Sequence, residues 1–465
     1  RSGGFSLAYF SRPPAERIGS ALATGPLSHL GRRNHPWGME NQRPETNDAS
    51  GQPDAVTGGR RAGIVFIWLT LFLDILGIGI VIPVLPELVQ SMLPPGATES
   101  TAANWYGLIA ASYAAMQFFC APVIGALSDR FGRRPIILAS LFGFAIDFLI
   151  QGYATSLLWL FIGRLLAGVM GATITTGNAY IADISTPENR AKNFGLVGAA
   201  FGLGFVIGPA LGGVLGSYWL RLPFFVAAFL ALCNWMYGYF VLPESLPADR
   251  RSKFDLRQIN PFRNIWQIRE YPMVAGLAIS LAIFALAQRG LENVWVLHGS
   301  YRYDWDILQN GLMLGLVGVM ACVVQGGLVR PLTKRFGERR LSLFGLGLAS
   351  ISFLGYGLAS AGWMVPILII FGSLAGVGGP AIQSIIAGRV DETHQGRVQG
   401  AITGLTSLMN VIAPVLFTKF LFSYFTAAQR TVPLPGIPFL VGSGLIAISL
   451  LVTAMVFRRF RPSDS

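Results

Sequence analysis

The chain has 465 residues, of which 52% are hydrophobic and only 12% are charged, and its mean hydropathy is +0.54. Soluble proteins carry about 25% charged residues, so this composition excludes an ordinary soluble domain. The net charge of +12 would suggest a nucleic-acid partner for a soluble protein, but basic cytoplasmic loops explain it in a membrane protein. We therefore expect a protein of the lipid bilayer that binds no nucleic acid.

The first 61 residues are polar and show no sustained periodicity, which predicts a disordered cytoplasmic segment. The sequence starts with Arg1, and Met39 opens a hydrophilic stretch shortly before the first apolar run. We interpret Met39 as the natural start and 1–38 as non-native upstream sequence. This segment has no apolar core of its own and so does not resemble a secretory signal.

Twelve apolar segments follow, each long enough to cross a bilayer as a helix. A polar, basic linker at 243–271 divides them into a bundle at 62–242 and a bundle at 272–457, followed by a tail at 458–465. The predicted fold is an all-α membrane protein with twelve transmembrane helices in two pseudo-symmetric six-helix halves. The predicted segments are 62–86, 104–127, 136–154, 157–181, 194–217, 222–242, 272–297, 308–331, 341–359, 363–387, 398–423 and 436–457.

Lysine and arginine gather in alternate connections between these segments. The connection after the second segment, the central linker and the tail after the twelfth segment are basic, whereas the connection between the third and fourth has neither residue. The positive-inside rule then places the basic loops and both termini in the cytoplasm.

A charged turn, GALSDRFGRRP from Gly125 to Pro135, joins the second and third segments. A weaker copy, RPLTKRFGERR, begins at Arg330 in the same setting. Charges that bind helix ends in one conformation and release them in another form a gate; the alternative is a basic loop that only sets topology. We assign a cytoplasmic gate to Gly125, Asp129, Arg130, Gly132, Arg133 and Arg134.

The two turns differ at one acidic position. Asp129 stands four residues before Arg133, a favourable pairing if the turn is helical. The copy has Lys334 where the first turn has Asp129, so we expect two unequal gates.

Three charges fall inside apolar segments, where they are costly and indicate function. Asp74 lies about 18 Å into the first segment at 1.5 Å per residue, and Asp147 lies at a comparable depth in the third. Arg164 of the fourth segment, which runs the opposite way, reaches a similar depth and could pair with Asp147. Burial favours a neutral acid while arginine favours a charged one, a balance that suits a proton carrier; the alternative is a static ion pair that fixes packing.

Glycines recur every four residues in the fifth segment, a spacing that lets helices approach closely. Pro209 lies among them and can kink the helix. The motif residues are Gly204, Gly208, Pro209, Gly212 and Gly213. Close packing alone and a functional bend at the proline both remain open.

Three features are assigned structural roles. Arg289 and Glu292 are expected to pair within the seventh segment, and His298 and Asp304 to lie solvated in the outer loop that follows. The three cysteines, in apolar segments without metal spacing, are expected in the core: Cys120, Cys233 and Cys322.

The sequence contains none of the catalytic or nucleotide-binding motifs that we looked for. The chain has no Gly-Lys-Ser/Thr phosphate loop, no His/Cys metal cluster and no serine triad arrangement. We therefore expect no enzymatic activity and no cofactor, with a proton gradient as the energy source.

The charged turn resembles the signature loop of the major facilitator superfamily. The run from Gly163 to Gly168 resembles its fourth-helix signature, and that from Gly204 to Gly213 resembles the fifth-helix signature of its drug:proton antiporters. Five further segments resemble the tetracycline-efflux branch of this superfamily. They are Leu73–Gly79 with Pro83 and Pro86, Pro223–Phe225, Pro243–Ser245, Val294–Leu297 and Gln395–Gly400.

This resemblance implies proton-coupled efflux of a small amphipathic compound, by a monomer in the bacterial inner membrane. It also implies that Asp74, Asp147 and Arg164 couple protons to transport. The sequence departs from the branch at Ala349 and Ala321, where tetracycline pumps carry an acid and can carry a histidine, although Gln325 is retained. Tetracycline is therefore one candidate substrate among xenobiotics.

Polar side chains in the apolar segments are candidate lining of the substrate cavity. We name Gln117, Phe118, Asn178, Met320, Gln325, Gln383 and Asn410. Two other functions remain open: an uptake symporter or uniporter of the same fold, and a membrane receptor that transports nothing.

Overall fold

The computed structural model describes residues 54–171, 173–252, 268–390, 392–427 and 432–460. The predictions for residues 1–38 and for Met39 lie outside the described residues. Apolar composition and helix-compatible lengths produce helices wherever a spanning segment was expected, and twelve of them are long and apolar enough to cross a membrane. No strand occurs among the described residues.

The first half contains α1 to α8. α1 (Asp54–Val81) packs on α7 (Pro187–Tyr218) and α8 (Leu222–Val241), and α4 (Arg133–Tyr153) packs on α8 and on α5 (Leu157–Met170). α3 (Glu99–Phe131) lies against α5, and α6 (Thr173–Ile184) continues the direction of the fourth span. Two clusters of buried apolar residues hold these helices together.

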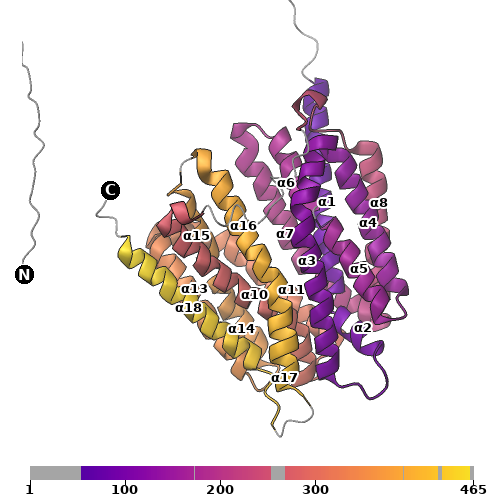
Figure 1. The fold of residues 1–465 in the computed structure, drawn as a ribbon, viewed down its shortest axis with the longest axis vertical. Coiled ribbons are helices and arrows are strands. Elements are labelled where there is room, and N and C mark those ends of the chain that lie inside the picture. The colour runs from indigo at the N-terminus through magenta and orange to yellow at the C-terminus, as the bar shows by residue number, and fades with distance from the viewer. Residues whose placement is uncertain (1–53, 172, 253–267, 391, 428–431, 461–465) are drawn as a thin grey trace, which may run out of the picture. The chain divides into compact units, whose positions relative to one another are not determined.

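The second half repeats this plan with α10 (Pro272–Tyr303), α11 (Ile307–Val323), α12 (Val329–Phe336), α13 (Glu338–Leu358) and α14 (Met364–Ser373). It ends with α15 (Gly378–Ala387), α16 (Glu392–Pro414), α17 (Ser423–Phe425) and α18 (Ile437–Arg459). α10 packs on α16 and α18, and α13 packs on α15 and α18. Figure 1 shows the labelled helices of each half, coloured by their place in the chain.

Short irregular turns interrupt three spans of the second half. They are π-helix η4 (Val324–Leu328), 3₁₀-helix η5 (Leu374–Val377) and π-helix η6 (Val415–Phe422). Glycines lie in or beside the first two, and Pro414 directly precedes the third, where its missing N–H removes a helical hydrogen bond.

Several predicted boundaries were wrong, the first of them at the start of the first segment: α1 begins at Asp54, so residues 54–61, which were predicted to be disordered, are helical. The first segment does not continue to residue 86: α1 ends at Val81, and a separate helix α2 (Leu85–Ser91) begins at the prolines, because a proline interrupts a helix but is tolerated in its first turn. The charged turn is also tighter than expected, since α3 continues to Phe131 and α4 starts at Arg133. Gly132 alone separates them, with a φ of 103° that favours glycine.

The halves pack more closely at one end than at the other. At the end that carries α2 and α17, the Ser100 and Ser423 hydroxyls lie 2.8 Å apart, and a Cβ at Gly213 would lie 3.0 Å from the Ile307 oxygen. Toward the basic turns, a Cβ at Gly198 of α7 or Gly326 of η4 would meet nothing within 4 Å. The seam between α7 and α11 is therefore closely packed at the end opposite the charged turns, whereas Gly198 and Gly326, nearer to those turns, are exposed.

Candidate functional site

Asp74 is buried in α1, with 8% of its surface exposed. Its Oδ2 atom has no hydrogen-bond partner. One helical turn away, Thr70 Oγ1 donates to Asn234 Oδ1 of α8 over 3.3 Å, so the neighbouring polar group is already satisfied from another helix. A buried carboxylate with an unpartnered oxygen is costly in its charged form, and the predicted role of Asp74 in proton coupling stays a prediction.

Glycines bring α1 against α7 immediately beside Asp74. A Cβ at Gly204 would lie 2.8 Å from Ile75 Cγ2, and one at Gly208 would lie 2.8 Å from the Gly79 Cα. A Cβ at Gly212 would overlap the Ile80 oxygen, and the opposite face of α7 meets α11 through Gly213. The predicted close approach is confirmed, while a bend at Pro209 stays a prediction.

Asp147 is almost fully buried in α4, and its Oδ1 accepts a 2.7 Å hydrogen bond from Gln151 Nε2. The absence of a side chain at Gly163 makes room for this pair, because a Cβ there would lie 3.0 Å from Asp147 Oδ1. The anticipated contact between Asp147 and Arg164 is absent, since the salt bridges among the described residues do not include it.

The geometry of α5 explains this difference. Gly163 faces α4, and the next residue on a helix points about 100° away. Arg164 therefore turns toward α3, where its charge acts on Tyr106 and Tyr113, and its Nε and Nη2 atoms have no hydrogen-bond partner. It remains close enough to act electrostatically on Asp147. The two charges share a region of the first half without touching.

The first charged turn is held by a network of ion pairs. Arg133 Nη1 lies 2.5 Å from Asp129 Oδ1, which confirms the predicted pairing. Arg133 Nε lies 3.1 Å from Asp183 Oδ2 of α6, and Arg133 Nη1 also donates to the Ser128 hydroxyl over 2.6 Å. The single side chain of Arg133 thus ties α3, α4 and α6 together.

Glu244, at the start of the central linker, closes this network, and sequence reasoning missed its role. Its carboxylate accepts from the backbone N–H groups of Arg133 at 2.8 Å and Arg134 at 3.3 Å. These donors are free at a helix N-terminus, where a negative charge is favoured. Gly132 leaves the space that the carboxylate occupies, because a Cβ there would overlap Glu244 Oε2. The acid directly after the sixth span was the available signal.

The remaining predicted gate residues lie at the edge of this network. Arg134 Nη2 donates to the Tyr239 carbonyl over 2.7 Å, and Arg130 stacks over the ring of Phe131. Gly125 borders open space, since a Cβ there would meet nothing within 4 Å.

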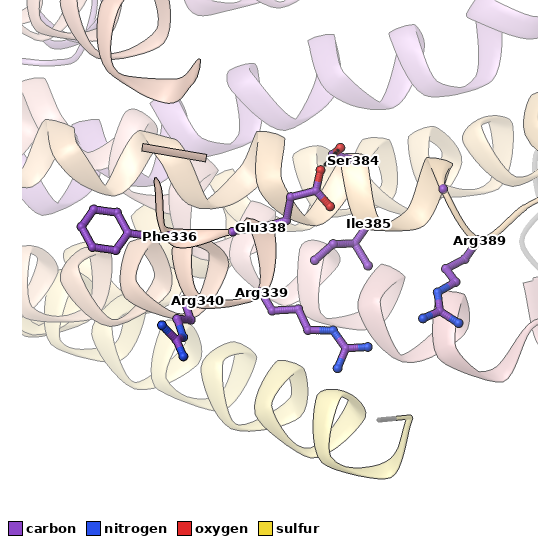
Figure 2. Close-up of a pocket in the computed structure, with 9 residues that line it drawn as sticks. Phe336, Glu338, Arg339, Arg340, Ser384, Ile385 and Arg389 are labelled. Carbon is purple, nitrogen blue, oxygen red and sulfur yellow. Dashed lines mark hydrogen bonds between the residues drawn. The ribbon is translucent and has the colours of Figure 1, made fainter. Parts of the chain in front are cut away.

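The second turn lacks this network. Gly337 again separates two helices and has a positive φ of 74°. A Cβ placed there would have no neighbouring atom within 4 Å. Glu338 stands at the position of Arg133 and binds the Ser384 hydroxyl of α15, while Arg339 Nη2 donates to the Phe460 carbonyl over 2.9 Å. Glu338, Arg339 and Ser384 line an open pocket of about 450 Å³ together with Arg340 and Arg389. Figure 2 shows these five side chains. The two turns are unequal, as predicted.

The seven predicted cavity residues lie on five spans. Gln117 Nε2 lies between α3 and α5, 3.4 Å from both the Tyr113 hydroxyl and the Gly171 oxygen. Phe118 is buried, Gln325 and Gln383 are exposed, and the rest are partly exposed: Asn178, Met320 and Asn410. Their role toward a substrate stays a prediction.

Three minor predictions can also be compared with the structure. Arg289 and Glu292 do pair, at 2.5 Å. His298 is not solvated: α10 extends to Tyr303, so His298 is buried, with Nδ1 3.1 Å from the Pro435 oxygen. Cys120 is partly buried, whereas Cys233 and Cys322 are exposed rather than in the core, so the prediction was wrong for these two.

Comparison with known proteins identifies the family. The model of the Major Facilitator Superfamily matches residues 67–414. The chain belongs to this superfamily. It is 39% identical to the class C tetracycline resistance protein of Escherichia coli over 83% of this chain and 95% of that one, and 36% identical to the class G protein of Vibrio anguillarum over 77% and 90%.

A solved structure supports the fold. The crystal structure of the human organic anion transporter MFSD10 (TETRAN) is 24% identical and covers 85% of this chain and 99% of its own, with a TM-score of 0.65. The chain is thus a multi-pass membrane transporter of this superfamily, and not an enzyme.

Proposed function

We propose that this chain exports a small amphipathic compound, of the tetracycline-like or wider xenobiotic class, in exchange for protons. The observation that carries the proposal is the buried, unpartnered acid Asp74 on the helix that packs along the glycine seam of α7. The similarity to tetracycline resistance proteins over most of the chain favours export over uptake by a symporter or uniporter.

In this proposal the structure represents the state that faces the cytoplasm. The less closely packed end of the α7–α11 seam lies toward the basic turns, which the positive-inside rule assigns to the cytoplasm together with both termini. We assign the chain to the bacterial inner membrane, as a monomer without cofactor, with bundles at 62–242 and 272–457 and a cytoplasmic linker at 243–271.

Exchange requires that protons and substrate prefer different states, since a ligand that binds both states equally shifts nothing. Asp74 and Asp147 take up the proton, and Arg164 favours the charged form of Asp147 until the proton arrives. The compound enters between the halves, where Gln117, Asn178, Gln325, Gln383 and Asn410 offer polar contacts and Phe118 and Met320 offer apolar ones.

The ion-paired turn fixes the first half as one body while the halves move. Arg133 and Glu244 hold α3, α4, α6 and the linker together in the state described here. The second turn lacks ion pairs among its described residues, and the polar contact there between α13 and α15 is that of Glu338 with Ser384, beside their apolar packing. The first bundle then acts as the rigid partner.

A drug panel in a pump-deficient bacterial host tests this function. Wild type should raise resistance to at least one amphipathic compound, and Asp74→Asn and Asp147→Asn should lose that resistance at equal expression in the membrane. Glu270→Gln, which removes an exposed acid from the linker end, is the matched control and should retain resistance. Unchanged resistance in both aspartate variants would favour the receptor alternative.

A further inference from the structure

The closed end of the molecule contains a cavity of about 210 Å³ between the two halves. The first half contributes Pro83, Pro86, Glu87, Gln90, Glu99 and Ala102, and the second contributes Val296, Leu297, Ser300, Trp305, Ile307, Asn310 and Phe422. The cavity includes residues of α2 and the last residue before α17, and Figure 1 shows these two helices at the same end of the bundle. It is distinct from the buried acids of α1 and α4.

Negative charge dominates this cavity. Each glutamate of the first half acts on an aspartate of the second: Glu87 on Asp306 and Glu99 on Asp304. Burial raises the pKa of Glu87 above its ordinary value, and the Asp306 carboxylate raises it further. No lysine or arginine lines the cavity among the described residues. Glu87, Glu99, Asp304 and Asp306 are all exposed, so they form a solvated rim around the cavity, and a cation bound there would reduce the repulsion between the two halves.

Two amide oxygens add unfilled acceptors to the acids. Asn310 lines the cavity and is 1% exposed, and its Nδ2 donates to Ser300 Oγ, Trp305 O and Asp306 O at 3.1–3.2 Å. Its Oδ1 accepts nothing, and Oε1 of Gln90 likewise has no partner. Buried acceptors without donors are uncommon and call for a ligand.

The rest of the lining is mostly apolar and aromatic, and this composition favours an organic ammonium group over a metal ion as the bound cation. Among the described residues, no three His, Cys, Asp or Glu side chains are arranged to hold a metal ion. The aromatic side chains of Trp305 and Phe422 line it, and prolines and aliphatic side chains form most of the remaining wall. Carboxylates beside aromatic rings are the surroundings that organic ammonium groups prefer. The volume is below the roughly 300–1,000 Å³ of drug-sized pockets, so it suits one such group.

We propose that this outer cavity binds the organic ammonium group of a cationic amphiphile, between Glu87 and Glu99 of one half and Asn310, Trp305 and Phe422 of the other. Because both halves line it, an ammonium ion bound there stabilises the state that is closed at this end. Its role as an exit site for exported cations rests on the proposed function, whereas its ligand chemistry rests on the cavity alone.

Calorimetric titration of the purified full chain tests the site, with choline as the cation and 3,3-dimethylbutan-1-ol as its uncharged isostere. Choline should bind, and the isostere should neither bind nor compete. The double variant Glu87→Gln with Glu99→Gln should weaken choline binding about tenfold or more, because two charge-assisted contacts are lost. Glu270→Gln should bind as wild type does.

Three results would overturn the site: absent choline binding, equal binding of the isostere, or unchanged affinity in the double variant. Binding of Mg²⁺ without binding of choline would instead assign the acids to a metal, also against the proposal. If the double variant does not fold, the single variant Glu99→Gln gives the same comparison with one charge removed. Because the titration uses no proton gradient, choline binding is independent of whether export is proton-coupled.

Discussion

The turn around Gly132 and its copy around Gly337 end and begin helices in the same way but are held by different forces. The first is fixed by Arg133 between two aspartates and by the Glu244 carboxylate on the start of α4. The second has Glu338 at the place of Arg133 and Lys334 at that of Asp129, and no ion pair forms among its described residues. The two halves therefore repeat the same helix–turn–helix geometry but not the same ion pairs.

The same contrast holds inside the membrane. The first half buries Asp74 and Asp147, whereas the second places Ala349 in its core and closes its α10–α18 contact with hydroxyls, Ser280 lying 2.7 Å from Ser449. A neutral hydroxyl cluster fixes packing without exchanging a proton at physiological pH. Under the proposed function, the first half carries the proton coupling, and the Arg289–Glu292 pair of the second half has a structural role.

The largest expected effect comes from removing charge in the first half only. Asp74→Asn should reduce gradient-driven accumulation of substrate to the level of vesicles without protein, because the amide exchanges no proton. Ser280→Ala should keep coupled transport and lower stability by about 1 kcal/mol, the typical value of a lost hydrogen bond. Transport assays and thermal unfolding on the two variants measure the difference. Equal loss of transport in both would remove the division between the halves.

The next largest effect is expected from arginine substitutions in the two charged turns, which should reduce transport to different extents. Arg133→Gln breaks both salt bridges of a side chain that is 10% exposed, and we expect transport to fall about tenfold, since breaking a buried pair leaves charges uncompensated. Arg339→Gln removes one hydrogen bond to the Phe460 carbonyl and should change transport less than about twofold. Initial transport rates at matched expression are the readout; a larger effect of Arg339→Gln would reverse the comparison.

Substitution of the turn glycines separates the cost of backbone strain from the cost of displacing the Glu244 carboxylate. Gly132→Ala and Gly337→Ala both place a side chain at positive φ, which costs about 1–3 kcal/mol. Only Gly132→Ala also displaces the Glu244 carboxylate, so it should unfold at the lower temperature of the two. Adding Glu244→Ala to each variant is the control: it should narrow the difference in melting temperature, and a difference that persists would mean that the contact with Glu244 is not its cause.

The smallest effect is expected from copying the first turn into the second. Lys334→Asp with Glu338→Arg creates the same pair four residues apart, but on an exposed surface, where such a pair contributes about 0.3–0.5 kcal/mol. Chemical denaturation should detect a small gain that disappears in high salt. A loss of stability would show that the Glu338–Ser384 contact contributes more than the new pair.

Much of the fold was predictable because bilayer thickness sets helix length and lipid excludes unpaired backbone. The twelve spans and the repeated turn follow from apolar runs alone. Their interruptions did not: the break after Val81 depends on Pro83 and Pro86, and three irregular turns fall inside spans of uniform hydropathy.

The buried acids and the charged turn could be picked out from the sequence, but most of their contacts could not. Buried acids stand out in apolar sequence, and the spacing of Asp129 and Arg133 gave their pairing. The direction of Arg164 depends on its angle around α5 relative to Gly163, and the role of Glu244 depends on a linker folding back onto α4. The depth of a residue along its helix, which was the basis of the sequence prediction, indicates neither the direction of Arg164 nor the contact of Glu244.

Transport by the purified chain in sealed proteoliposomes, with and without an imposed pH difference, tests proton coupling most directly. The compound is one for which the chain confers resistance. The account predicts accumulation only while the pH difference lasts, with simultaneous proton movement that Asp74→Asn abolishes. Equal flux of the compound after the pH difference has been dissipated would contradict it.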